Sequence, residues 1–420
     1  MLTVAQYFGT LAAARCLGRR GVRVSAADHQ WLAPALWSRY TAQSFRSPPM
    51  GQVPAFVNWL LDFGRSHPGH LLYPSSDDAA WLYARYAAEL SRHFVLWQPA
   101  LPVIERVLNK RLLARAAEDA GIAVPRTSFV ADEAELTQFA AGPFPLLIKP
   151  QTQVLFEPHL KGWLVESGAE LVAAWRGFRA AARHAPELIA TQPDIELPLL
   201  QAYSASSARG IYTVAGFMDE TGELFVAAAS RKVFQWPRPL GVGICFEAAP
   251  LEAVVAERLR ALCRQLGYFG VFEVEFLESQ GGYQLIDFNP RFYGEMAFEI
   301  DRGLPLPWLV YLAALGRRDE LRAEVERAGS AALVAGRIYC HRQRLRTMLR
   351  LQGFLGAMDR DEIARWRAWL AACDGRVTDP VSDPDDRRPG WLAAGLEVVS
   401  YARHPRAFLR QIILSRTSGS

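Results

Sequence analysis

The sequence predicts a mixed fold, α/β in its first part and α+β in the remainder. Strand and helix patterns alternate over residues 1–98, and this order argues for a parallel sheet. Farther along, residues 210–230 and 272–291 each show two apolar strands joined by a turn, which predicts antiparallel hairpins. Helical patterns dominate from residue 317 onward. A chain of 420 residues is expected to form roughly two to three domains, and these parts agree with that number.

The composition excludes several classes of function. Half of the residues are hydrophobic and 21% are charged, which is typical of a chain with a large core. The net charge is only +4, from 47 basic and 43 acidic residues, and this balance argues against nucleic acid as the main partner. The longest apolar stretch, residues 304–315, contains two prolines and is too short to span a bilayer.

Cysteine usage and the first residues predict a cytoplasmic protein. The five cysteines are odd in number and widely spaced, with no CxxC pair or zinc-ligand spacing, as expected in a reducing compartment. The chain begins without the charged start and long apolar stretch of a signal peptide. Motifs of P-loop proteins, zinc proteases and serine hydrolases do not occur in the sequence.

The alternating pattern at the start predicts a small domain with a parallel sheet. We expect a strand over residues 2–8, a helix over 9–20 and a second strand over 22–26, followed by Asp28. A further strand near residue 71 runs into an acidic helix cap. Asp28 would suit a ribose in a dinucleotide-binding fold, but no Gly-x-Gly-x-x-Gly follows the first strand.

Two of the four lysines in the chain lie at the start or the end of a predicted element. Lys149 ends the apolar run 144–150, where a buried charge is costly unless it is paired, and a phosphate is a natural partner. Lys110 opens a predicted helix, where a solvated side chain is the ordinary alternative. Residues 198–203 predict a short apolar strand, in which Gln201 is a polar interruption.

A hairpin in the middle of the chain is followed by two cations. Strands over residues 210–217 and 224–230 are joined by a polar turn. The second strand is expected to deliver Arg231 and Lys232 onto a Pro/Gly-rich loop that ends near Gly243. Two cations before such a loop suit an acyl phosphate or an acidic substrate, and a solvated basic turn is the alternative.

The second hairpin carries the most specific chemistry of the sequence. Two apolar strands separated by a Gly-Gly turn carry Glu275 on the first strand and Asp287 and Asn289 on the second. Side chains alternate along a strand, so Asp287, Asn289 and Arg291 point the same way, and Glu275 can face them if the strands pair. Oxygen-only ligands of this kind suit Mg²⁺, which also shares the phosphates of a nucleotide.

These residues resemble the metal-binding signature of the ATP-grasp superfamily, a Glu followed by Asp/Glu-x-Asn-x-Arg. The surrounding residues 283–294 are similar to its carboxylate–amine ligase and carbamoyl-phosphate-synthetase-like branches. The resemblance implies a pre-ATP-grasp domain over residues 1–98 and a two-lobed ATP-grasp domain over 99–316. Its lobes would cover about residues 99–200 and 201–316, and a helical extension would occupy 317–420.

The resemblance also implies a role for each matching residue. Arg291 meets the phosphoryl group or the substrate carboxylate, and Arg231 and Lys232 lie on a mobile substrate loop. ATP and Mg²⁺ are the implied cofactors, with two ions expected and Mn²⁺ as an alternative. The implied magnesium ligands are Glu275, Asp287 and Asn289, and the implied nucleotide contacts are Lys110, Lys149, Gln201 and Tyr203.

The sequence departs from the family pattern at three positions. Asp287 stands where Glu is usual, which shortens its reach to a metal. Tyr293 and Glu295 stand where a Trp and a small residue are expected. These changes concern the substrate pocket more than the nucleotide site.

By this resemblance the protein is expected to be an ATP-dependent carboxylate–amine ligase. It would form an amide, or peptide-like, bond through an acyl phosphate and release ADP and phosphate. Two alternatives remain open at this point: an ATP-grasp enzyme that activates bicarbonate, and a nucleotide-binding regulator without turnover. The expected partners are small-molecule carboxylates and amines, with a homo-oligomer possible.

The C-terminal part is less informative. Residues 342–351 form the pattern of a basic amphipathic helix, with arginines interleaved among leucines and a methionine. Such a helix can lie on an anionic membrane, but a solvated face on a domain surface is the commoner case and the one we favour.

Overall fold

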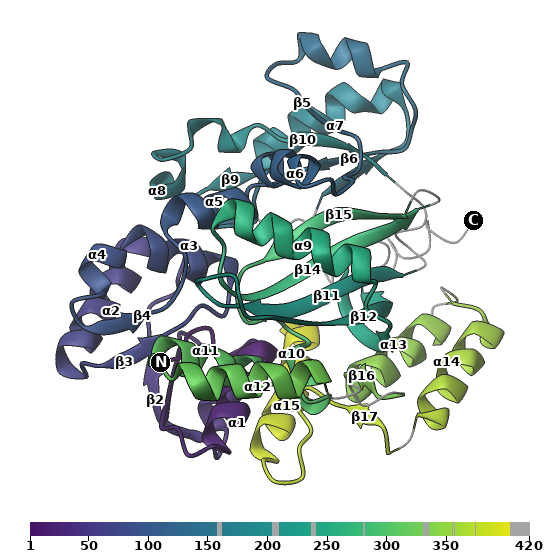
Figure 1. The fold of residues 1–420 in the computed structure, drawn as a ribbon. Coiled ribbons are helices and arrows are strands. Elements are labelled where there is room, and N and C mark those ends of the chain that lie inside the picture. The colour runs from purple at the N-terminus through teal and green to yellow at the C-terminus, as the bar shows by residue number, and fades with distance from the viewer. Residues whose placement is uncertain are drawn as a thin grey trace.

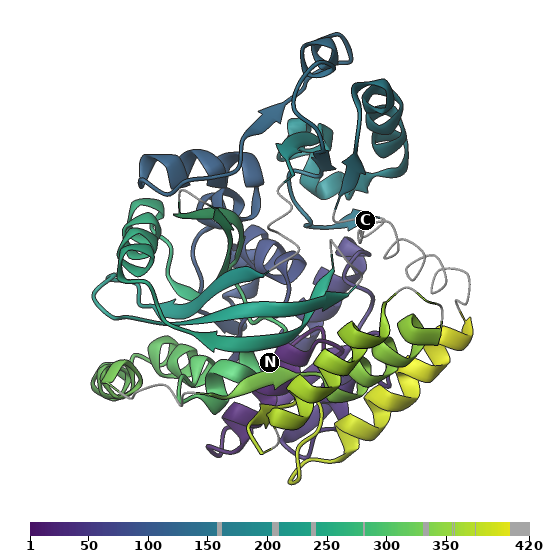
Figure 2. The same ribbon diagram turned by 90° about the vertical axis from the view of Figure 1, so that its right-hand side faces the viewer.

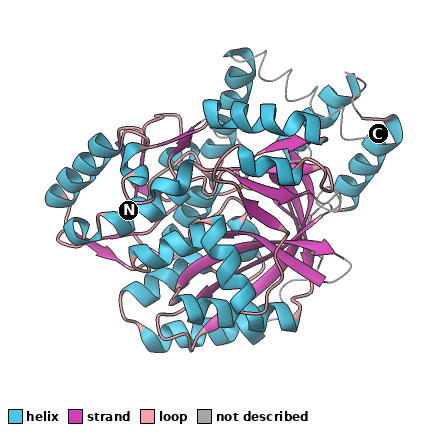
Figure 3. Cartoon of the chain, turned by 90° about the horizontal axis from the view of Figure 1, so that it is seen from above, coloured by secondary structure: helices cyan, strands magenta, loops and turns pink. Residues whose placement is uncertain are grey.

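The structure, a computed structural model, describes residues 1–157, 162–203, 210–236, 241–279, 282–330, 336–354, 356, 358–373 and 375–403. Within these residues the chain forms a four-stranded and a seven-stranded sheet, together with three pairs of strands (Figure 1). Seen from above, helices lie on both sides of the strands (Figure 3). No helix in this part of the chain combines the length and apolar character needed to cross a membrane.

The N-terminal region contains parallel strand pairs, as the alternating pattern predicts. Strand β1 (Val24–Asp28) pairs in parallel with β2 (Thr41–Arg46), and β3 (His70–Leu72) pairs in parallel with β4 (Phe94–Leu96). The helices of this region are α1 (Phe8–Gly18), η1 (Pro34–Trp37), α2 (Val53–Ser66), α3 (Asp77–Arg85) and α4 (Ala87–Leu90).

The predicted strand over residues 2–8 is wrong. A single parallel bridge joins Leu2 to Ala26, and the chain then turns away. Val4 has a φ of 55°, in the left-handed region that a β-branched residue rarely adopts, and the backbone bends there into α1. The helix and the second strand of this segment are confirmed, with bounds shifted by one or two residues.

The four-stranded sheet has the order β5-β10-β6-β8 and carries helix α7 on one face. Its strands are β5 (Thr127–Phe129), β6 (Leu146–Lys149), β8 (Trp163–Val165) and β10 (Leu199–Ala202). The other elements of this segment are α5 (Leu101–Leu108), α6 (Lys110–Asp119), η2 (Ala134–Phe139), β7 (Phe156–Glu157), α7 (Gly168–Ala181), β9 (Arg183–His184), α8 (Pro186–Ile189) and η3 (Pro193–Glu196). Asn109 caps α6 by accepting from the backbone N–H groups of Arg111 and Leu112, as expected for an N-cap asparagine.

The seven-stranded sheet has the order β15-β14-β11-β12-β13-β16-β17. Its central strands are antiparallel and confirm both predicted hairpins. They are β11 (Ile211–Met218), β12 (Phe225–Trp236), β13 (Val242–Ala249), β14 (Gly270–Ser279) and β15 (Gly282–Asn289).

Both faces of this sheet are covered. Alternate residues of β11, such as Tyr212 and Val214, pack with helix α9 (Ala253–Leu266). The intervening residues, such as Ala215 and Phe217, pack with α11 (Leu306–Ala314) and α12 (Arg318–Ser330) on the other face. All eight residues of β11 are buried, which explains why this strand is apolar throughout rather than alternating.

The C-terminal segment is mainly helical, as expected, and it also adds two short strands to the sheet. Strand β16 (Ile338–Cys340) pairs with β13, and β17 (Val377–Thr378) pairs with β16. The helices here are α13 (Arg342–Phe354), α14 (Arg360–Ala372) and α15 (Arg388–Arg403). Helix α10 (Met296–Asp301) follows the second hairpin in the chain.

Helix α13 is the predicted basic amphipathic helix. Its residues Leu345, Met348 and Leu349 are buried against Phe234 and Trp236 of β12. The apolar face of this helix is therefore used inside the protein, whereas Arg346 and Arg350 are exposed. Figure 2 shows the C-terminal helices, in light green to yellow, beside the N-terminal region in purple.

A buried arginine joins the C-terminal segment to the N-terminal region. Arg15 of α1 donates to the carboxylate of Asp386 at 2.9 Å and to the backbone carbonyls of Pro380, Val381 and Asp386. The Asp386 carboxylate also accepts from Ser38 and from the backbone N–H of Arg39. These hydrogen bonds join residues 15–39 to residues 380–386, which are far away in the sequence. They therefore hold the N-terminal region and the C-terminal segment together.

We expect Arg15→Met to lower the free energy of unfolding by about 3 kcal/mol, because it leaves the Asp386 carboxylate buried without its cation. Hydrogen exchange in residues 379–391 should speed up with it. The control is Arg19→Met on the same helix, where the side chain is 41% exposed and the loss should stay below about 1 kcal/mol. Equal losses in the two variants would contradict the anchoring role of Arg15.

Candidate functional site

The register of β14 and β15 brings the predicted acids together. Glu275 lies directly opposite Asp287, and Glu273 lies directly opposite Asn289. Directly opposed residues in an antiparallel pair project from the same face of the sheet, so all four side chains share one face. The residues of the turn at 280–281 lie outside the described part of the chain, and the paired strands on either side are as predicted.

Each of the two facing carboxylates forms an ion pair with a lysine from another element. Lys232 of β12 donates to Glu275, and the lysine side chain is only 4% exposed. Lys110, the first residue of α6, donates to Asp287 at 2.5 Å. Burial by itself lowers the pKa of Lys232, but Glu275 and then Glu273 and Glu295 raise it above its usual value, so the lysine is charged.

Arg291 and Asn289 form a second chain of contacts beside these pairs. Arg291 donates to Oδ1 of Asn289 at 2.6 Å and to the carboxylate of Asp77 at 2.8 Å. Nδ2 of Asn289 donates to Glu273 at 2.5 Å. Asp77 belongs to the first turn of α3, so the N-terminal region holds the arginine of the hairpin in place. Burial opposes the charge on Arg291, but Asp77 raises the pKa of its guanidinium above the usual value.

Sequence reasoning missed two acids of this face. Glu273 is 2% exposed, and burial, with Glu295 and Glu275 nearby, raises its pKa well above the usual range. Glu295 was noted only as a departure from the family pattern. Burial raises the pKa of Glu295 to about 7, against the opposing effect of Lys232. The signal for Glu273 was its position two residues before Glu275 on an apolar strand.

Lys149 and Gln201 lie together on the four-stranded sheet. Lys149 ends β6 and Gln201 lies on the neighbouring strand β10, where its Oε1 accepts from Lys149 at 3.4 Å. Nε2 of Gln201 donates to the hydroxyl of Thr127 on β5. Tyr203 follows β10, and its backbone N–H donates to Pro145. Gln201 is therefore in contact with the lysine, and Tyr203 follows it at the end of the same strand.

The prediction that Arg231 and Lys232 lie together on a loop is wrong. Both belong to β12, and consecutive strand residues point to opposite faces. Lys232 faces Glu275, whereas Arg231 forms an ion pair with Glu278 and lies 5.8 Å from the ring centroid of Tyr212 on the other face. Arg231 is thus separated from the acids by the sheet itself. Residues 237–240, which continue the expected loop, lie outside the described residues.

The donors at the hairpin fit Mg²⁺. Glu275 and Asp287 offer carboxylate oxygens from facing positions, and the Asp287 side chain is 40% exposed. Oδ1 of Asn289 accepts from Arg291, but an amide oxygen has two lone pairs, so one remains for a cation. Among the described residues, no cluster of three or more His, Cys, Asp and Glu side chains is arranged to hold a metal. The set present, two acids and an amide, suits Mg²⁺, which uses one or two carboxylates together with phosphates and water.

Comparison with solved structures identifies the fold. A biotin carboxylase from Campylobacter jejuni, solved with a β,γ-ATP complex, superposes with a TM-score of 0.59 at 15% identity, over 75% of this chain and 70% of that one. An N5-carboxyaminoimidazole ribonucleotide synthetase with ADP gives a TM-score of 0.56 at 14% identity, over 74% and 75% of the two chains. The chain has the ATP-grasp fold.

A third ATP-grasp structure was solved with several ligands. The biotin carboxylase domain of the 2-oxoglutarate carboxylase from Hydrogenobacter thermophilus, a dimer, contains MgADP, ADP and bicarbonate. It matches with a TM-score of 0.57 at 14% identity, over 75% of this chain and 69% of that one. No protein-family model and no curated protein sequence matches the chain. The division into residues 1–98, 99–316 and 317–420 stays a prediction.

Replacement of Glu295 by glutamine should change stability in a pH-dependent way. Because its folded-state pKa of about 7 exceeds the usual value of 4.5, the stability linked to its protonation is present below 4.5 and is lost as the pH rises through 7. Glu295→Gln, which keeps the side chain neutral, should therefore raise the melting temperature at pH 8 and leave it nearly unchanged at pH 4.5.

The exposed Glu326→Gln on α12 serves as the control for a lost carboxylate. Melting temperatures of both variants are compared with those of the wild type at the two pH values. A shift for Glu295→Gln that is equal at pH 8 and pH 4.5 would show that Glu295 titrates normally.

Proposed function

We propose that the protein is an ATP-dependent ligase that joins a carboxylate to an amine through an acyl phosphate. The observation that carries the proposal is the face of β14 and β15, where Glu275 and Asp287 lie opposite each other and each pairs with a lysine. This arrangement places acids for a metal and cations for phosphate side by side, and phosphoryl transfer depends on both.

In this proposal Glu275, Asp287 and Asn289 hold Mg²⁺. When ATP and the metal are bound, ATP supplies the phosphoryl group and the metal offsets the negative charge of the triphosphate. Lys110 and Lys232 exchange part of their pairing with the acids for pairing with phosphate. Their present carboxylate partners hold both ammonium groups in position beforehand, so little reorganisation is needed on binding.

The nucleotide is proposed to extend from the hairpin to the four-stranded sheet. Lys149 provides a point charge for phosphate, and Gln201 and Tyr203 provide polar contacts near the end of β10. Gln201 already fixes Lys149 through its amide oxygen and is fixed in turn by Thr127. These contacts hold the lysine in one orientation.

The chemistry proceeds in two balanced steps. An oxygen of the substrate carboxylate attacks the γ-phosphorus, the bond to the bridging oxygen breaks, and ADP leaves. The amine nitrogen then attacks the acyl carbon, the carbon–oxygen bond to phosphate breaks, and phosphate leaves with the electron pair while the nitrogen loses a proton. Arg291 is the cation for the carboxylate or the phosphoryl oxygens, since its planar fork can grip two oxygens at once.

A bicarbonate-activating enzyme is the second candidate, favoured by the bicarbonate in the 2-oxoglutarate carboxylase structure. A regulator that binds ATP without turnover is the third. ADP release is measured in bicarbonate-free buffer over a library of acids and amines, with bicarbonate added separately. The ligase requires an acid and an amine together. ADP release with bicarbonate alone would favour the second candidate, and nucleotide binding without ADP under any condition would favour the third.

Asp287→Asn should lower the rate of ADP release by about two orders of magnitude or more, while the protein remains folded. The amide keeps the shape of the side chain but removes one of the charges proposed to offset Mg²⁺. Glu278→Gln is the matched control, because Glu278 is an exposed acid of the same hairpin that faces the other side of the sheet. Unchanged ATP consumption in Asp287→Asn would refute the metal assignment.

Lys149→Met should weaken nucleotide binding by about tenfold or more and have little effect on the melting temperature. The methionine retains the packing of the lysine stem and removes only the charge. Binding is measured by calorimetry with a non-hydrolysable ATP analogue, and Arg176→Met, an exposed cation on α7, is the control. Wild-type nucleotide affinity in Lys149→Met would show that Lys149 has a structural role only.

A further inference from the structure

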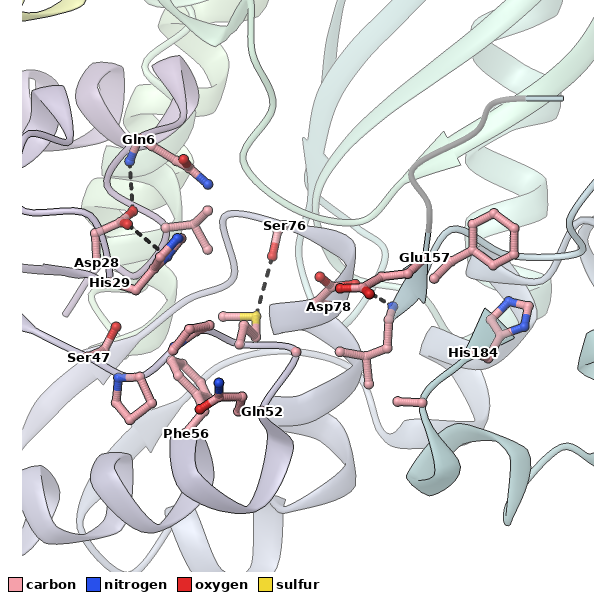
Figure 4. A pocket seen from close by; sticks show the side chains of 18 of the residues that line it. Gln6, Asp28, His29, Ser47, Gln52, Phe56, Ser76, Asp78, Glu157 and His184 are labelled. Carbon is pink, nitrogen blue, oxygen red and sulfur yellow. Dashed lines mark hydrogen bonds and ion pairs between the residues drawn. The ribbon is translucent and has the colours of Figure 1, made fainter. Parts of the chain in front are cut away.

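A cavity of about 530 Å³ lies between the N-terminal region and the β7–β9 strand pair, next to the proposed reaction centre. Its size falls within the range of roughly 300–1,000 Å³ that is usual for small-molecule sites. Figure 4 shows Asp28, with Gln6 and His29, on one side of this cavity and Asp78, Glu157 and His184 on the other. Its lining comes from six separate stretches of the chain, and none of the lining residues is assigned to the proposed nucleotide site.

The lining combines an apolar surface with a few polar groups. Met50 and Phe56 contribute apolar side chains from the N-terminal region, and Leu155 and Phe156 contribute them from the β7 segment. Such a lining is typical of sites in which apolar contacts provide affinity and a small number of polar groups fix the orientation of the ligand.

The charge of the lining is negative. Asp78 and Glu157 contribute carboxylates on one side of the cavity, with Arg183 as the nearby cation of the lining. The Arg183 guanidinium donates to the backbone carbonyls of Arg179 and Ala182, both at 2.7 Å, and so is directed to the end of α7. Burial lowers the pKa of His184, which leaves this histidine neutral near pH 7.

The third acid of the lining, Asp28, has a structural role. Its side chain is 1% exposed and accepts from the backbone N–H groups of Gln6 at 3.0 Å and Gln30 at 2.8 Å. These bonds fix the two loops that form one wall of the cavity. Ligand recognition therefore falls to the acids of the opposite wall.

The first turn of a single helix contacts both the cavity and the hairpin. Asp77 and Asp78 are consecutive residues in the first turn of α3. Asp77 binds Arg291 of the proposed reaction centre, whereas Asp78 lines the cavity and accepts from the backbone N–H of Leu155 at 2.7 Å. A ligand beside Asp78 would thus lie next to Asp77, the residue that binds the arginine proposed to hold the acyl donor.

We propose that this cavity binds the amine substrate, and that the amine carries a cationic group recognised by Asp78 and Glu157. The inference rests on the proposed ligase function and names its second substrate as a small cationic amine. The balance of charge supports it, because the cavity lining has more acids than cations, whereas Glu275 and Asp287 of the hairpin are each paired with a lysine. The two substrates are thereby directed to opposite sides of Asp77.

Binding is tested with 1,4-diaminobutane as the probe and 1,4-butanediol as its neutral counterpart, by calorimetry on the full chain. The diamine should bind saturably and the diol should not. Asp78→Asn and Glu157→Gln should each weaken diamine binding by about fivefold, the effect expected for a partly exposed ion pair. Glu326→Gln, which removes an equal charge from the surface of α12, should leave binding unchanged. Equal affinity for diamine and diol, or equal effects of all three variants, would overturn the proposal.

A second variant tests the location of the site. A Cβ added at Gly51, which lines the cavity, would meet only the carboxylate of Glu157 at 4.0 Å, so Gly51→Trp should fill the cavity without straining the fold. This variant should lose diamine binding. Gly329→Trp on α12, where an added Cβ meets nothing within 4 Å, is the control and should retain it. Retained diamine binding in Gly51→Trp would place the site elsewhere.

Trapping of the acyl phosphate separates this inference from the proposed function. Hydroxylamine attacks an acyl phosphate directly and gives a hydroxamate without needing the amine cavity. With the carboxylate found in the ADP-release screen, Gly51→Trp should still form hydroxamate while amine-dependent product is lost. Loss of both in a folded Gly51→Trp would mean that the cavity serves the first step and would overturn the amine assignment. Absence of hydroxamate in the wild type would instead refute the acyl phosphate, and the diamine titration would remain valid as a separate result.

Discussion

The arrangement of the candidate site depends on the compensation of buried charge on one face of β14 and β15. Four acidic or amide side chains project from two paired strands, and two of them, Glu273 and Asn289, are buried. Ionised groups in such a place are stable only when opposite charges meet them with good geometry. Lys232 from β12 and Lys110 from α6 supply these charges, so the sheet and the helix that precedes the four-stranded lobe are held in a fixed relation.

The same constraint connects the N-terminal region to the site. Arg291 would be an isolated cation at the end of β15, and it is compensated by Asp77 from α3 and by the amide oxygen of Asn289. Glu273 in turn accepts from Asn289, and burial raises the pKa of this acid well above its usual range, which reduces the number of charges that need partners. The network thus passes from the first hundred residues through the hairpin to its buried centre, and each member limits the orientation of the next.

Two differently charged surroundings lie a short distance apart around Asp77. On the hairpin side, Lys110 and Lys232 are paired with the acids of the strands. The cavity beside Asp78 is lined by more acids than cations, on a partly apolar surface. The C-terminal segment supports this geometry from a distance: β16 and β17 extend the sheet beyond β13, and Arg15 fixes the segment against the N-terminal helix.

Sequence alone determined the two hairpins, the alternation of helix and strand at the start, and the identity of Glu275, Asp287, Asn289 and Arg291 as one group. These follow from local rules, since strand alternation and turn residues act over a few positions. Tertiary structure decided what local rules leave open. The length of β12 put Arg231 and Lys232 on opposite faces, and only the pairing partners showed that Glu273 and Asp77 belong to the network. Compensation of a buried charge involves residues that are distant in sequence, as with Arg15 and Asp386, and therefore it is fixed only when the whole chain has folded.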